Sequence, residues 1–160
     1  MKKISILVVI VLSVLVFYAC KKKSNDDEPP KTPPVTVNKQ DILSANLWII
    51  QSVNANGTDI WNSPFPIVSN CYKDNDYKFR KDDKMVIFDN TNKCETTDPD
   101  SAVNNYKYFE STNQMFIDAT FSAGIAIKDT TNVLELTSST LKIDAEYSGI
   151  PAVITFIKKP

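Results

Sequence analysis

The segment Leu141-Lys142-Ile143-Asp144-Ala145-Glu146-Tyr147 alternates apolar and charged residues, with Ala145 as the smallest apolar member. Successive side chains of a β-strand point to opposite faces of a sheet, so this period of two predicts a strand with one dry face and one wet face. Strands of this kind are typical of antiparallel sheets, in which one face packs on the core and the other meets water. The fold is therefore expected to contain half-buried antiparallel strands.

Two hairpins upstream continue the pattern. In the first, a strand at 76–80 leads through the turn Lys81-Asp82-Asp83 to a returning strand at 84–89. The second places strands at 105–110 and 114–119 around Ser111-Thr112-Asn113. The other expected elements are a short helical turn at 40–45, strands at 47–53, 131–137 and 150–157, a short strand at 125–128, and a turn at Asn56-Gly57. Short strands joined by turns in this number indicate an all-β barrel or, as the alternative, a β-sandwich; a closed barrel leaves no exposed edge strand.

The N-terminus has the organisation of a bacterial lipoprotein signal peptide, which we place at 1–19. A positively charged start precedes an apolar run of about 15 residues, shorter than the roughly 20 that span a bilayer. Ala19 then stands directly before Cys20, so we expect Cys20 to carry the lipid and to attach the protein to a membrane. The alternative is an uncleaved helical anchor that ends at the three lysines after Cys20.

Residues 20–38 contain four prolines and no apolar periodicity, which predicts a disordered, extended stalk. Its acidic stretch at 24–28 resembles export tags of gram-negative lipoproteins. We therefore expect an outer-membrane lipoprotein, on the periplasmic face or the cell surface. The remaining residues, 39–160, are long enough for one domain with a real core.

Composition excludes several functions for this domain. It carries sixteen acidic against twelve basic residues and a single arginine, which argues against nucleic acid as a partner. The chain has no histidine and only three glycines, so histidine-based catalysis, histidine-ligated zinc and phosphate-cradling loops are absent. We expect no enzyme activity, no cofactor and no metal. The acidic pairs Asp74/Asp76 and Asp98/Asp100 fit turns better than a calcium loop, whose glycine and final glutamate are missing.

Cys71 and Cys94 form an even pair once Cys20 is modified. A disulfide is the default for such a pair in an oxidising compartment. A metal-thiolate site lacks further ligands because the chain has no histidine. The sequence therefore predicts a Cys71–Cys94 disulfide.

Large apolar side chains share the strand phase that should face the interior. They are Tyr77, Phe79, Tyr106, Tyr108, Met115, Ile117, Leu141, Ile143 and Tyr147. Their charged neighbours, such as Lys78 and Glu146, must reach water and so fix the opposite face. In a barrel this set either lines an apolar ligand pocket or fills the core.

The loop 60–68 is apolar, but Pro64 and Pro66 exclude a central strand. We expect it to fold across a barrel mouth as a lid, or to expose Trp61 and Phe65 to a partner; simple packing on the barrel is the alternative. Ser101 and Thr130 each follow an aspartate in short motifs that resemble the acceptor of a gram-negative O-glycosylation system.

The run Ile42-Leu43-Ser44-Ala45-Asn46-Leu47-Trp48-Ile49-Ile50 resembles the opening of bacterial lipocalin-like lipoprotein domains. A cysteine followed by an acidic turn and an aromatic strand, 71–79, matches a second feature of that family, and Cys94 falls where its second cysteine does. Asn46 stands where the family has glycine. The resemblance implies an eight-stranded up-and-down barrel and no catalytic residue. It favours a membrane-tethered module that binds a small apolar or amphipathic ligand; the alternative is a structural or protein-interaction lipoprotein with a solid barrel and an envelope protein as partner.

Overall fold

The computed structural model describes residues 37–160. The predicted signal peptide 1–19, the lipidation site Cys20 and all but the end of the predicted stalk 20–38 lie outside the described residues. Within them, the elements in chain order are α2 (Lys39–Ala45), β1 (Trp48–Ala55), β2 (Thr58–Asp59), η1 (Asn70–Tyr72), β3 (Asp76–Phe79), β4 (Lys84–Phe88), β5 (Ser101–Phe109), β6 (Gln114–Ser122), β7 (Ile125–Leu136), β8 (Thr140–Tyr147) and β9 (Ile150–Lys158).

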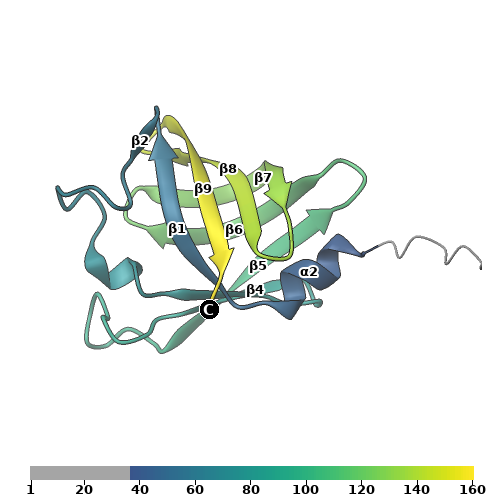
Figure 1. Ribbon diagram of the computed structural model, residues 1–160. Coiled ribbons are helices and arrows are strands. Elements are labelled where there is room, and N and C mark those ends of the chain that lie inside the picture. Colours follow the sequence, from purple (N-terminus) through teal and green to yellow (C-terminus); the bar gives the residue numbers. More distant parts are fainter. Residues whose placement is uncertain (1–36) are drawn as a thin grey trace, which may run out of the picture. The chain divides into compact units, whose positions relative to one another are not determined.

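The strands form a closed antiparallel barrel (Figure 1). From β3 to β9 each strand pairs with the next, and β1 pairs with both β3 and β9, which closes an eight-stranded barrel. The short β2 is an additional strand that pairs with β1. This architecture confirms the all-β, up-and-down barrel expected from the alternation, and it excludes the sandwich.

Local sequence explains the ends of several elements. The Asn38 side chain accepts a hydrogen bond from the Gln40 amide and caps the start of α2. Asn56 and Gly57 both have positive φ angles, 51° and 80°, as the tight turn between β1 and β2 requires. The turn before β9 uses Ser148 and Gly149 in the same way.

Two strands differ most from their expected bounds. The expected strands 125–128 and 131–137 are one strand, β7, because residues 125–132 pair with β6 almost without interruption. Its pairing with β8 is interrupted. Ile125 lies opposite Tyr147, and the next pair is Val133 with Ile143, so the mostly polar residues between Ile125 and Val133 are not paired with β8. Strand β5 begins at Ser101 rather than Asn105, because residues 101–104 pair with β4 even though their pairing with β6 starts only at Asn105.

The barrel has two chemically different ends. At one end, which we call the helix end, Gln40 and Lys39 of α2 bond to Tyr106 and Asn113, beside the short β3–β4 and β5–β6 turns. The other end carries the long connections 60–75 and 89–100 and is called the loop end. Figure 1 shows α2 and the loop 60–75 on opposite sides of the barrel. Loops presented by a rigid barrel are where binding residues are most often found.

Candidate functional site

The interior of the barrel is filled by side chains. Seven of the nine predicted pocket residues are fully buried, namely Tyr77, Phe79, Tyr106, Met115, Ile117, Leu141 and Ile143. The other two, Tyr108 and Tyr147, are half-buried and pack against the same core. The inward direction expected for these side chains is therefore what the structure has. Four hollows on the surface of the described residues have no member of this set in their lining.

Aromatic rings pack edge to face across the interior. The Phe156 ring lies 5.3 Å from that of Tyr77 and 6.2 Å from that of Phe79, measured between centroids. The Phe79 ring is 5.0 Å from that of Tyr106. Contacts of this geometry stabilise a core beyond their buried area. They also occupy the space that an apolar ligand would need.

Both ends of the core are covered. Leu43 of α2 is fully buried at the helix end, and its carbonyl oxygen accepts a hydrogen bond from the Trp48 indole at 3.0 Å. Trp61 and Val68 of the loop 60–68 are buried in the same core cluster. Phe65, between the two prolines, is 75% exposed. The two predicted lid residues therefore differ: Trp61 packs on the barrel, and Phe65 is exposed.

One polar atom in the core has no partner. The Tyr77 hydroxyl is buried and makes no hydrogen bond within the described residues. Burial, with a smaller contribution from the Asp76 charge, raises the pKa of Tyr77 well above its usual range. The group therefore stays neutral, and its hydroxyl is left without the hydrogen bond that a buried phenol normally makes.

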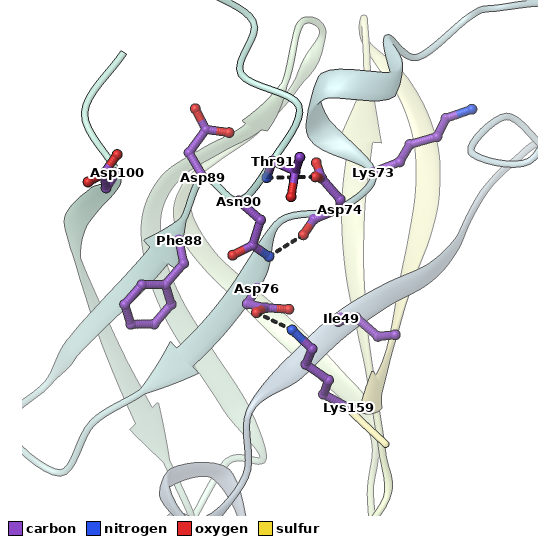
Figure 2. Close-up of a pocket in the computed structure, with 10 residues that line it drawn as sticks. All are labelled: Ile49, Lys73, Asp74, Asp76, Phe88, Asp89, Asn90, Thr91, Asp100 and Lys159. Atoms are coloured by element: carbon purple, nitrogen blue, oxygen red, sulfur yellow. Dashed lines mark hydrogen bonds and ion pairs between the residues drawn. The ribbon is translucent and has the colours of Figure 1, made fainter. Parts of the chain in front are cut away.

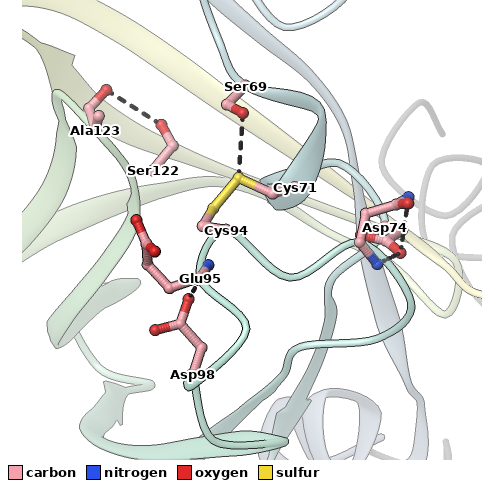
Figure 3. The surroundings of a disulfide bond; sticks show 9 residues. Ser69, Cys71, Asp74, Cys94, Glu95, Asp98, Ser122 and Ala123 are labelled. Carbon is pink, nitrogen blue, oxygen red and sulfur yellow. Dashed lines mark hydrogen bonds between the residues drawn. A yellow bond between two sulfur atoms is a disulfide. The ribbon is translucent and has the colours of Figure 1, made fainter.

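The loop end is tied together by the Cys71–Cys94 disulfide (Figure 3). The two Cα atoms are 5.0 Å apart, within the range that a disulfide needs. The bond connects the 3-10 turn before β3 to the long β4–β5 connection. The predicted pairing is confirmed, and it fixes the two longest connections of the barrel to each other.

Five aspartates gather around these tied loops: Asp74, Asp76, Asp89, Asp98 and Asp100. We call them the acidic rim. The Asp74 carboxylate accepts hydrogen bonds from the amides of Thr91 and Asn92, both at 3.0 Å, so it holds the 89–100 connection against the 71–75 connection. The rim joins segments that are distant in sequence.

An outer hollow of about 770 Å³ lies on one flank of the rim (Figure 2). Two of the four aspartates that line it pair with lysines. Asp76 pairs with Lys159 at 2.5 Å, and Asp100 pairs with Lys93 at 2.6 Å. The bond to Lys93 lowers the pKa of Asp100 and raises that of Lys93. Lys73 also lines the hollow.

A second hollow, of about 300 Å³, lies at the loop end where β5 separates from β6, and we call it the mouth pocket. Its lining is Tyr72, Asn75, Ile87, Asp89, Cys94, Asp98, Pro99, Ala102, Asn104 and Thr120. This lining contains two carboxylates and no lysine or arginine. Burial, and then the nearby charge of Asp98, raise the pKa of Asp89, while the charge of Lys93 acts in the opposite direction.

The described residues contain no group of three or more Cys, Asp or Glu side chains arranged to hold a metal ion. No helix among residues 37–160 has the length and apolar character needed to cross a bilayer. Ser101, at the start of β5, and Thr130, within β7, both have exposed side chains.

Sequence reasoning missed the mouth pocket. Asn75 gave no signal, because single asparagines are common in loops. Asp89 was expected at the end of the strand 84–89, and Asp98 was interpreted as a turn residue. The one available signal was the disulfide, since a bond from Cys71 to Cys94 must bring the flanking acids of both loops to one place.

Comparison with protein-family models and with curated proteins finds no match for this chain. The structure itself defines the class of fold, a closed eight-stranded antiparallel barrel.

Proposed function

We propose that this chain is a lipid-anchored protein of the bacterial cell envelope, with a solid barrel that acts as a non-enzymatic scaffold for contacts with other envelope proteins. The observation that carries the proposal is the filled interior, in which buried side chains from all eight barrel strands form one core cluster and both ends are covered. Small eight-stranded barrels are just wide enough for side chains to fill them. A barrel packed in this way acts through its surface.

The anchor rests on the short apolar run before Cys20, and the outer membrane on the acidic stretch that follows it. The resemblance to bacterial lipocalin-like lipoproteins supports the same placement. Within the described residues, the loop end is the surface best suited to contacts, because it combines the exposed Phe65 with the acidic rim. The disulfide holds its connections in place, so a partner meets a preformed surface.

A second candidate is a small amphipathic ligand held inside the barrel. The unpartnered hydroxyl of Tyr77 favours it, since a polar group of a ligand would satisfy that atom. Such a ligand must displace core side chains, which places a large energetic cost on its entry.

Uptake of an apolar fluorophore separates the two candidates. We expect a soluble chain that begins after Cys20 to take up no 1-N-phenylnaphthylamine while folded. The Phe79→Ala variant should lose roughly 3–5 kcal/mol of unfolding free energy in urea, because Phe79 is fully buried among other rings. Saturable uptake by the wild type that is weakened by Phe79→Ala, with only a small loss of stability, would instead support the internal ligand.

A further inference from the structure

We propose that the mouth pocket is a binding site for a small organic cation, whose primary ammonium group donates hydrogen bonds to Asp89, Asp98 and Asn75. This site is independent of how the barrel interior is used. It lies outside the core, beneath the disulfide-tied connections, and adds a ligand to the scaffold role.

Charge is the first reason. The lining of the mouth pocket contains two carboxylates and no basic side chain, whereas the outer hollow next to it contains two lysines. Lys93, the nearest basic residue that acts on Asp89, is already engaged. Its Nζ bonds to the Asp100 carboxylate at 2.6 Å and to the Asp98 carbonyl oxygen at 2.8 Å. The pocket therefore keeps negative charge that a ligand can neutralise.

The second reason is an acceptor without a donor. Asn75 is only 7% exposed, it lines the pocket, and its Oδ1 has no hydrogen-bond partner among the described residues. A buried amide oxygen that lacks a donor is costly, and such groups in folded proteins are usually satisfied by water or a ligand. An ammonium group carries three donors and no acceptor, which matches this set of oxygens.

The carboxylates are also available. Among the described residues Asp89 accepts no side-chain hydrogen bond, and Asp98 accepts one, from the Glu95 amide at 2.8 Å. Figure 3 shows the Asp98 carboxylate beside Glu95 and below the disulfide. Part of the remaining wall is apolar or aromatic and is made by Tyr72, Ile87 and Pro99, whereas Asn104 and Thr120 are polar. They suit the methylene groups of an alkyl amine, and the Tyr72 ring adds a face that attracts cations.

A metal ion fits less well. No group of three or more acidic or cysteine side chains in the described residues is arranged as ligands. At about 300 Å³ the hollow is larger than a bare ion needs and lies at the lower end of small-molecule sites. The occupant is therefore an organic cation of a few carbon atoms.

Calorimetric titration of the full-length chain in a nonionic detergent tests the proposal. The probe is 1,4-diaminobutane, and 1,4-butanediol is its neutral match. We expect one diamine site per chain and no heat from the diol. Asp89→Asn should weaken diamine binding by about tenfold or more, since hydrogen bonds to charged groups are the strong ones. Glu110→Gln is the control, because it removes one charge at the opposite, helix end and should leave binding unchanged.

Asn75→Leu separates a binding role from a structural one. Because this change removes a buried acceptor that has no donor, the ligand-free variant should melt at the same or a higher temperature than the wild type, while its affinity for the diamine falls. A lower melting temperature with unchanged affinity would show that Asn75 serves the fold alone. This variant also keeps the proposal testable if Asp89→Asn fails to fold.

The pH dependence of diamine binding tests the proposal on the wild-type chain. Asp89 is faced by Asp98, Asp74, Asp100 and Lys93, and its pKa is raised first by burial and then by the charge of these aspartates. Diamine affinity should therefore decrease as the pH falls through the range in which Asp89 takes up a proton. Equal binding of diamine and diol, no binding of either, or tight calcium binding without diamine binding would each overturn the proposal.

Discussion

Tyr106 connects the barrel core to α2 through its hydroxyl group. The hydroxyl donates to the Arg80 carbonyl oxygen at 2.6 Å and accepts from the Gln40 side chain at 2.7 Å. Its ring packs on Phe79 inside the barrel. One residue thus joins the helical cap, the β3–β4 turn and the core.

This environment should make the fold less stable at alkaline pH. Burial is the main cause that raises the pKa of Tyr106 to about 12, above its unfolded value near 10. The fold favours the neutral phenol, so the stabilisation is fully present below pH 10 and is lost as the pH rises from 10 to 12. We expect the urea midpoint of the wild type to fall across this window and that of Tyr106→Phe to fall less steeply. Parallel curves for the two proteins between pH 8 and pH 12 would contradict the assignment.

At the scale of elements, the two connections at the loop end depend on one covalent bond. The 60–75 and 89–100 connections contain few backbone hydrogen bonds to the barrel, and the Cys71–Cys94 bond closes a sequence separation of 23 residues. Closing a chain of this length limits the freedom of the unfolded state. The bond therefore stabilises the fold and positions the acidic rim.

Replacing both Cys71 and Cys94 by serine should lower the free energy of unfolding by roughly 2–4 kcal/mol, measured in urea under oxidising conditions. The wild type treated with a reductant is the matched control and should lose a similar amount. Near-ultraviolet circular dichroism should still show a packed barrel, because neither cysteine lies in the core cluster. Two titratable thiols in the exported, unreduced wild type would show that the bond does not form.

Sequence patterns predicted most strands well because most of them carry their own alternation. Strand β8 has the inward residues Leu141 and Ile143 between charged neighbours, and no distant information is needed to recognise it. The prediction for strand β7 was less accurate, since the polar middle section of this strand has no alternation and is held in a strand only by pairing with β6. Local sequence does not contain that pairing.

The loop end was predicted least well, for the same reason. Trp61 is buried because the barrel offers it an apolar end to cover, and a loop sequence with two prolines does not reveal which aromatic residue turns inward. Asn75, Asp89 and Asp98 meet only because the β3–β4 register and the disulfide bring their loops together. A site assembled from two separate connections is a property of the tertiary structure.

At the scale of the whole molecule, the proposed scaffold role depends on the outer surface of the barrel and on where the protein is held. Cys20 should determine where the protein is held, because several acyl chains on one cysteine give stable membrane attachment. We expect Cys20→Ala to incorporate no labelled palmitate, to retain the signal peptide in its intact mass, and to disappear from the outer-membrane fraction. The Cys71→Ser/Cys94→Ser double variant is the matched control: those two sulfurs bond to each other, so it should be acylated and sorted as the wild type is. If Cys20→Ala keeps both the mass and the membrane fraction of the wild type, the apolar run at the N-terminus is an ordinary helical anchor and the lipid has no part in the attachment.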